Sequence, residues 1–450
     1  MALTKVSTDG VKDDAITKAK IPANQIEASE LASEAVTNAK LQTNSVDDRV
    51  LANNSVVTGV INNGAVTTNK IGDEQVTLAK LPHGDSNNDG KFLRANDGAD
   101  PSFETVPSSA KNLLTNGSML VNQRRSTGNL DYYNPVTSSI YTLDRWRVQL
   151  SGGFDTDSAH IHQSSTAPTQ HGFSKSLFVE IGNTETPSSG QMAGIQQRIE
   201  GQNLQRLAYG TSSAKTLTLS FWVRSVRTGT YSVQLIKLKS GSSDKYVLYS
   251  YTISSANTWE KKTITISPDT SDAIQDDNSI GFYITWWLCA HSDVTTSATS
   301  SWTNGGGYKA VTNQVNLWDS GSNEWYLTGC QLEIGSESTD YDHESFGDTL
   351  VKCRRYFWKS FNYGTKRYRN QGNSDSIFCA VVSGYNGGYH FKNQMRTAPT
   401  LTFYNPSADN SNSTSLGGCS HNRSTDNMIS VEIGCVAGNH YTELDADAEL

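Results

Sequence analysis

Apolar residues recur at every fifth position over the first part of the chain. The series is unbroken and comprises Val6, Val11, Ile16, Ile21, Ile26, Leu31, Val36, Leu41, Val46, Leu51, Val56, Ile61, Val66, Ile71, Val76 and Leu81. A helix turns about 100° per residue and a strand alternates its faces, so neither keeps a spacing of five on one side. The pattern therefore predicts a repetitive structure that is neither a plain helix nor a plain strand.

The repeating unit spans ten residues and is clearest in residues 35–44 (AVTNAKLQTN) and 65–74 (AVTTNKIGDE). Thr37 and Thr67 are placed to cap one short helical turn in these units. A unit with so few apolar residues cannot bury enough surface to offset the entropy of ordering its backbone, which costs about 1–2 kcal/mol per residue. Something must therefore cover the apolar row.

Three chains that wind together would bring their apolar rows onto a common axis and form a rod. We therefore expect residues 1–81 to form the shaft of a homotrimer. The alternative is a monomeric coil of the pentapeptide-repeat kind, which needs a small residue two positions before each central apolar residue. Three positions meet this requirement, namely Ala19, Ala39 and Ala79. Three others do not, namely Asn24, Glu34 and Glu74.

Residues 82–111 are dense in Gly, Pro, Asn and Asp around one short apolar stretch at Lys91–Leu93, which predicts a linker that contains a hairpin. Within it Asp85, Asn87, Asp89 and Gly90 match the first half of a calcium-binding loop. The twelfth position of that loop is Asn96 rather than a bidentate Glu. We expect an ordinary turn and no cofactor, with calcium at Asp85, Asn87 and Asp89 as the alternative.

Runs of alternating or continuous apolar residues are typical of short β-strands further along the chain. They are KSLFVEIG at 175, TLTLSFWVRS at 216, YSVQLIKL at 231, KYVLYSYTI at 245, KKTITIS at 261, SIGFYITWWL at 279 and EWYLTGCQLEIG at 324. Turns rich in Ser, Gly and Asn separate these runs. The fold class is therefore mainly β, with a two-sheet jelly-roll sandwich at residues 112–345.

Composition and charge narrow the class of protein further. A chain of 450 residues is long enough for two or three domains. Only 18% of residues are charged and the net charge is -8, so we expect no nucleic-acid partner. The beginning lacks the apolar core of a signal peptide and no long apolar run follows, so we expect assembly in a cytoplasm and no membrane insertion. The widely spaced cysteines predict free, mostly buried thiols.

Several stretches resemble bacteriophage tail fibre and tail spike proteins. NLLTNGSMLVNQR (112–124), DRWRV (144–148), LTLSFWVRS (217–225) and LTGCQLEIGS (327–336) are similar to the carbohydrate-binding-module-like jelly-roll heads of these proteins. The decapeptide repeat and DGKFLRAN resemble their stalks, and the distal domain is matched by YDHESFGDTLVKCRRYF (341–357), QMRTAPTLTFYN (394–405) and HYTELDADAEL (440–450). The resemblance covers nearly the whole chain.

The resemblance implies a homotrimeric virion protein of the phage tail. Its N-terminus would attach to a tail adaptor, nozzle or baseplate protein, and its outer end would bind host surface polysaccharide during adsorption. We expect residues 1–81 to be attachment and shaft, 82–111 the hinge, 112–345 the jelly-roll carbohydrate-binding-like head and 346–450 a distal receptor-binding β domain. The expected function is structural and glycan-binding rather than enzymatic; the alternative is a polysaccharide-depolymerising tail spike, a glycosidase or lyase.

A sugar site needs flat aromatic faces that stack on pyranose rings. The Trp-rich loop at residues 291–321 is too long for a hairpin turn, and long loops on a rigid sandwich often carry binding sites. We therefore expect sugar binding by Trp302, Tyr308 and Trp318 of the loop, with Trp287 on the preceding strand. The alternative is that these rings are core or interprotomer contacts.

Three further groups of residues have ordinary alternatives. Basic and aromatic residues interleave between Lys352 and Arg369, which indicates packed rings with solvated cations, or a contact with anionic polysaccharide, more than a nucleic-acid site. His160 and His162 share one face of a predicted strand and would meet a metal only on a trimer axis, so we expect no metal site. Carboxylates at 340–344, on a predicted strand, lack the constrained pairing that a glycosidase needs.

Overall fold

The computed structural model forms two compact units, Met1–Val106 and Pro107–Leu450. It describes residues 91–96, 99–105, 112–124, 139–154, 159–238, 244–305, 309–360, 363, 377–381, 387–404, 419–433 and 438–450, with residues 17, 21, 31, 35, 37, 67 and 71 of the repeat region. Most of the predicted shaft, the candidate calcium residues Asp85, Asn87 and Asp89, and Tyr308 of the predicted sugar site lie outside the described residues.

The N-terminal unit contains the hairpin that the linker sequence predicts. Strand β1 (Lys91–Asn96) pairs antiparallel with β2 (Ala99–Thr105), so this prediction is confirmed. Three apolar residues of the five-residue series are described, and all of them are exposed in the single chain: Ile21, Leu31 and Ile71. The shaft and its trimeric state stay predictions.

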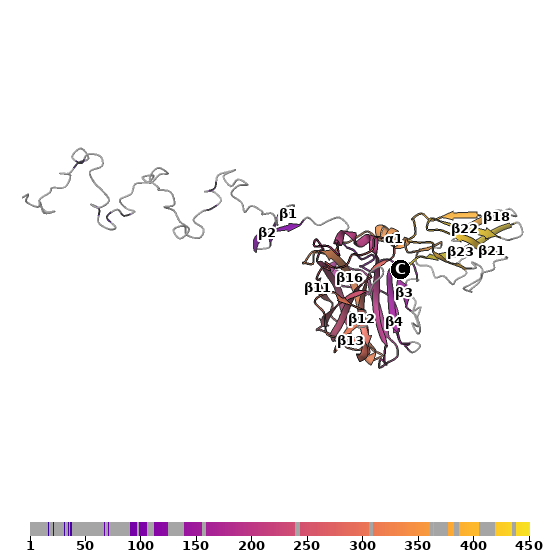
Figure 1. The fold of residues 1–450 in the computed structure, drawn as a ribbon, viewed down its shortest axis with the longest axis horizontal. Coiled ribbons are helices and arrows are strands. Elements are labelled where there is room, and N and C mark those ends of the chain that lie inside the picture. Colours follow the sequence, from indigo (N-terminus) through magenta and orange to yellow (C-terminus); the bar gives the residue numbers. More distant parts are fainter. Residues whose placement is uncertain are drawn as a thin grey trace, which may run out of the picture. The chain divides into compact units, whose positions relative to one another are not determined.

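Two antiparallel sheets form the sandwich of the second unit (Figure 1). In spatial order the larger sheet contains β14 (Thr303–Asn304), β10 (Lys245–Ile253), β9 (Gly229–Lys237), β12 (Ile280–Ala290), β7 (Met192–Glu200), β4 (Trp146–Ser151) and β3 (Ile140–Leu143). The smaller sheet contains β11 (Glu260–Ile266), β8 (Leu217–Ser225), β16 (Glu324–Ile334), β6 (Ser176–Ile181) and β5 (Ala159–Ser164). All the apolar runs predicted as strands between residues 175 and 335 form strands, so the mainly β class is confirmed.

The core lies between the two sheets and follows the alternation of the sequence. Along β8 the side chains of Leu217, Leu219 and Phe221 are fully buried, whereas Trp222 on the opposite face is half-buried. Trp286 of β12 is also fully buried and packs against Trp146, with 5.5 Å between the ring centroids. Burial of such large rings supplies most of the hydrophobic stabilisation of a sandwich.

Loops and short helices connect the strands. The loop after β12 holds the short parallel pair β13 (Thr295–Thr296) and β15 (Ala310–Val311). The 3-10 helices are η8 (Thr169–His171), η9 (Gly201–Leu207), η10 (Ser292–Val294) and η11 (Leu317–Asp319). Helix η9 follows directly on β7, so its residues lie at one end of the larger sheet.

An irregular segment and a helix follow the sandwich, where the sequence predicts strands. Residues 335–345 are irregular, so the strand predicted for Asp340, Asp342 and Glu344 is wrong. Helix α1 (Phe346–Arg354) follows, and the Ser345 hydroxyl caps it by accepting a hydrogen bond of 3.1 Å from the backbone N–H of Asp348. Such a cap satisfies one of the free N–H groups at a helix start.

The remaining strands form two small sheets. One contains β17 (Phe357–Lys359), β23 (Gly438–Asp447), β18 (Ile377–Val381) and β20 (Thr400–Tyr404), and the other contains β19 (Gly387–His390), β22 (Met428–Ile433) and β21 (Cys419–Ser424). The boundary at residue 345 and the other predicted domain limits stay predictions.

Ion pairs join the last residues to the sandwich. The carboxylate of Glu449 pairs with the guanidinium groups of Arg124 and Arg145, and all three side chains are largely buried. Arg145 also lies over the ring of Tyr356, 3.5 Å from its centroid. Because a buried charge is costly unless it is paired, these contacts hold the chain end against the sandwich.

Three cysteines lie in the interior of the second unit. Cys289, Cys330 and Cys353 are free and buried, as predicted, and burial raises the pKa of each thiol. Among the described residues no helix is both long and apolar enough to cross a membrane.

Candidate functional site

The predicted sugar-binding tryptophans lie in packed positions. Trp302 is half-buried; its ring stacks on Phe282 at a centroid distance of 5.7 Å, and its Nε1 donates a hydrogen bond of 2.8 Å to the backbone oxygen of Ser267. Trp318 is 2% exposed and packs against Phe154 at 5.4 Å. Trp318 therefore offers no open face to a sugar in this structure.

Trp287 lies on the outer face of the larger sheet, opposite in direction to its neighbour Trp286. Its Nε1 donates a hydrogen bond of 3.1 Å to Oε1 of Gln234 on β9, and only 2% of the residue is exposed. Strand β15 folds over the same face, where the backbone N–H of Val311 donates to the Ser232 hydroxyl at 2.8 Å. The loop that was expected to bind sugar thus covers part of this sheet.

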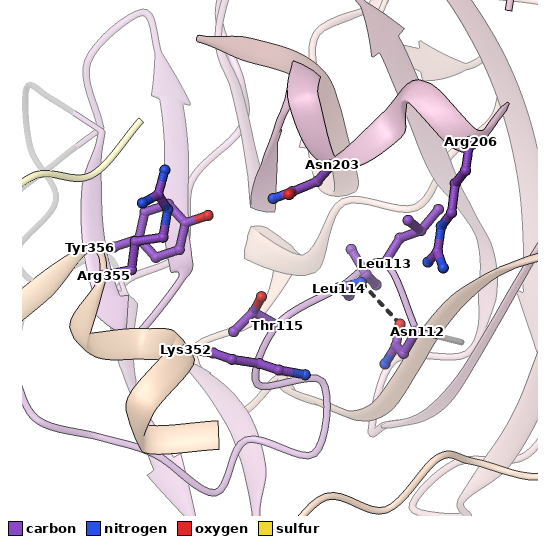
Figure 2. A pocket seen from close by; sticks show the side chains of 9 residues that line it. All are labelled: Asn112, Leu113, Leu114, Thr115, Asn203, Arg206, Lys352, Arg355 and Tyr356. Carbon is purple, nitrogen blue, oxygen red and sulfur yellow. Dashed lines mark hydrogen bonds between the residues drawn. The ribbon is translucent and has the colours of Figure 1, made fainter. Parts of the chain in front are cut away.

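A pocket of about 410 Å³ opens elsewhere on the second unit (Figure 2). Three segments far apart in the sequence line it: the stretch that leads into the sandwich, helix η9, and the end of α1 with the residues after it. The lining residues are Asn112, Leu113, Leu114, Thr115, Asn203, Arg206, Lys352, Arg355 and Tyr356. Its volume falls within the roughly 300–1,000 Å³ that is typical of ligand pockets.

Asn112 fixes the first segment against the smaller sheet. Its Oδ1 accepts hydrogen bonds of 3.0 Å from the backbone N–H groups of Leu114 and Leu332, and its Nδ2 donates to the backbone oxygen of Cys330 at 2.9 Å. Thr115 is held to the other sheet, because its backbone N–H donates to Oε1 of Gln197 at 2.9 Å. Hydrogen bonds to both sheets therefore hold this segment in place along the pocket.

Glu200 anchors the residues that follow α1. Nε and Nη2 of Arg355 donate to its two carboxylate oxygens at 2.9 and 2.8 Å, and the Tyr356 hydroxyl donates to the same group. Burial of Glu200 favours its neutral form, but the hydrogen bonds from Arg355 and Tyr356 lower its pKa below the ordinary value. Glu200 is therefore a carboxylate that holds Arg355 at the edge of the pocket.

The two other cations of the pocket differ in their partners. Lys352 forms an ion pair with Glu344. Within the part of the chain that the structure describes, the guanidinium group of Arg206 makes no ion pair and no hydrogen bond, and the residue is exposed. Two cations are thus matched by carboxylates outside the lining, and Arg206 is left as an unmatched positive charge.

The lining combines this charge with uncharged polar groups. Asn203 and Thr115 face the space between Arg355 and Tyr356 on one side and Arg206 on the other (Figure 2). Amides and hydroxyls can both donate and accept, which suits the hydroxyl groups of a sugar. None of the lining residues is a carboxylate. The pocket can therefore bind a polar, neutral or anionic ligand.

The basic and aromatic residues after 352 divide into two groups. Tyr356, Phe357 and Trp358 are packed, with at most 8% of each exposed, as the packed alternative predicts. Lys359 is buried too, so the expectation of solvated cations is wrong for this residue, and burial lowers the pKa of its ammonium group to about 8. Lys352 and Arg355 instead reach the pocket. The sequence placed both among the cations that could contact anionic polysaccharide, but it did not indicate the pocket.

The other candidate residues lie outside this pocket. Glu344 pairs with Lys352. His162 of β5 packs edge-on against Phe178 of β6, with 4.9 Å between the ring centroids. The described residues include no cluster of His, Cys, Asp and Glu that would hold a metal ion.

Comparisons with known proteins support no family assignment. No family model matches the chain, and no curated protein matches it. Among solved structures, the enzymatically active domain of tailspike protein 4 of bacteriophage CBA120 is similar over 51% of this chain and 22% of that chain, at 13% identity and a TM-score of 0.28. The chain thus spans less than a quarter of that protein's length.

Carbohydrate-binding modules of Clostridium thermocellum are similar as well. A family 11 module, solved with a β-1,3-1,4-mixed-linked tetrasaccharide, matches 45% of this chain and 96% of that chain, at 13% identity and a TM-score of 0.24. The C-terminal family 22 module of Xyn10B matches 46% and 98%, at 11% identity and a TM-score of 0.24. With scores this low, these likenesses assign neither a ligand nor an activity to this chain.

Proposed function

We propose that this chain is a glycan-binding fibre protein of a phage tail and that it binds host surface polysaccharide in the pocket between η9 and α1. The pocket itself is the main support, because a segment bonded to both sheets, two polar side chains with no hydrogen bond to the described residues and an excess of cations converge in one hollow of the second unit. Loops and helices carried on a rigid scaffold are frequent locations of binding sites.

The repeat supports the fibre part of the proposal. The unbroken apolar series needs a cover, and its described members Ile21, Leu31 and Ile71 are exposed in the single chain. A trimeric shaft would cover the series and carry three pockets on one rod. Three linked weak sites raise the apparent affinity for a repetitive polysaccharide without any tight single contact. The N-terminal part would attach to a tail adaptor, nozzle or baseplate protein.

Glycan binding by the purified full-length chain tests the proposal. We expect the wild type to bind immobilised host surface polysaccharide, and Asn203→Ala to weaken this binding because it removes an amide from the pocket. Ser213→Ala is the control, since Ser213 is exposed and lies outside the lining. Full binding by Asn203→Ala would place recognition elsewhere, and absence of binding by the wild type would contradict the function.

The same experiment addresses the enzymatic alternative. Released oligosaccharide in the supernatant over several hours would identify a depolymerising spike, whereas the proposed binding protein leaves the polysaccharide intact.

A further inference from the structure

We infer that the pocket selects acidic glycans, in which a sugar carboxylate binds Arg206. This inference rests on the proposed function and names the class of ligand. Overall the chain is acidic, with a net charge of -8, so general attraction to anions is not expected from its composition. A preference for an anion must therefore come from the local arrangement of charges.

The charges of the pocket leave one positive charge unmatched. Three cations line it, and Glu200 and Glu344 each pair with one of them. Arg206 has no such partner among the described residues. A ligand with one carboxylate per sugar residue would complete the balance.

The chemistry of the unmatched group favours a carboxylate. The guanidinium of Arg206 is planar and can donate two parallel hydrogen bonds to a carboxylate, an arrangement stronger than bonds between neutral groups. The corresponding face of Arg355 is already occupied in this way by Glu200. Arg206 is thus the lining guanidinium that forms no hydrogen bond with the described residues.

The polar residues between the cations would bind the rest of the sugar. Neither the side-chain amide of Asn203 nor the hydroxyl of Thr115 forms a hydrogen bond with the described part of the chain, although Thr115 is held through its backbone. Figure 2 shows both side chains between Arg206 and Tyr356, where the ring of an acidic sugar would reach them. Sugar hydroxyls can exchange both donor and acceptor bonds with these groups.

Paired glycans give the test. Full-length protein is applied to an array in which each uronic-acid oligosaccharide is accompanied by its carboxyl-reduced form, with inorganic phosphate as a separate competitor. We expect tighter binding to the carboxylated member, by about five- to tenfold, and a loss of this preference as salt rises from about 50 to 500 mM. Equal binding to both members would overturn the inference and leave the proposed function standing. Binding to neither would contradict the proposed function.

Two charge-neutralising variants locate the effect. Arg206→Gln should abolish the preference for the carboxylated member and retain binding to the reduced one. Lys261→Gln removes one exposed cation from β11, outside the lining, and should keep the preference. A preference that persists in Arg206→Gln would contradict the inference. Competition by millimolar phosphate without any preference for carboxylated sugars would identify a general anion site instead, and would also contradict it.

Discussion

Two cations of the second unit, Lys237 and Arg206, stand in opposite surroundings. Lys237 is fully buried, forms an ion pair with Asp269 and donates a hydrogen bond of 2.5 Å to the backbone oxygen of Asp272. The rings of Tyr209 and Trp302 lie 5.8 and 5.9 Å from its Nζ. Arg206 is exposed at a pocket and has no partner among the described residues.

The difference follows from the cost of removing a charge from water. A fully buried ammonium must be paired, whereas a guanidinium that is only partly desolvated can remain charged without a partner; partial burial lowers the pKa of Arg206. Burial lowers the pKa of Lys237. The hydrogen bond to Asp269 and the negative charge of that residue raise the pKa, but they offset the effect of burial only in part. The pair with Asp269 thus offsets part of the cost of burying Lys237, and the open cation of the pocket is available for binding.

Removal of the partner of Lys237 should have the largest effect. Asp269→Ala leaves a buried, unpaired ammonium and should reduce the free energy of unfolding by about 3–5 kcal/mol. Urea denaturation of the full-length chain measures this change. The exposed Asp276 serves as control, since Asp276→Ala should change stability by less than about 0.5 kcal/mol. Similar values for both variants would show that the Lys237 pair is not structural.

Acid should also weaken the ion pair between Lys237 and Asp269, because it protonates the Asp269 carboxylate as the pH falls. Burial raises the pKa of Asp269, but hydrogen bonds from Lys237 and Ser271 outweigh this and lower it to about 2. Because the pKa is lower in the folded state, the contribution of about 2 kcal/mol is present above about pH 4 and is lost as the pH falls through the folded value. Unfolding free energies between pH 5 and about 2 should fall less steeply for Asp269→Ala than for the wild type.

The hydroxyl of Tyr356 should make a smaller contribution at the edge of the pocket. Tyr356→Phe removes the hydrogen bond to Glu200 and should cost about 1 kcal/mol of unfolding free energy. Arg355 still pairs with Glu200 in this variant, so the preference for carboxylated glycans should persist. Thermal unfolding measures the change in stability, and the paired-glycan array measures the preference. A loss of the preference would assign Tyr356 a direct role in binding.

The strands were predictable because each signal is local. Leu217, Leu219 and Phe221 alternate with polar residues, and the structure buries all three. Helix α1 was missed, since its apolar pattern is weak; Ser345, three residues before Asp348, was the available signal of a helix start. The packed state of Trp287 and Trp318 depends on neighbours from other strands, which spacing along the chain does not reveal.

The pocket was not predictable for a related reason. Thr115, Asn203, Arg206 and Lys352 come from segments separated by many residues and meet only after the two sheets and α1 have formed. The partner of Arg355 is also remote, since Glu200 and Arg355 stand 155 residues apart, whereas Lys352 pairs with Glu344 in the residues just before α1. The sequence shows the cations but not which of them keeps an open face.

Arg206→Gln should change stability the least, and it tests the proposed binding role of Arg206 most directly. Unfolding and binding of this variant should be measured together, on the full-length chain, with a uronic-acid oligosaccharide found by the array. We expect a change in unfolding free energy below about 0.5 kcal/mol and a five- to tenfold weaker binding, about 1 kcal/mol. Unchanged affinity, or a loss of stability as large as that of Asp269→Ala, would contradict the assignment of Arg206 to ligand binding.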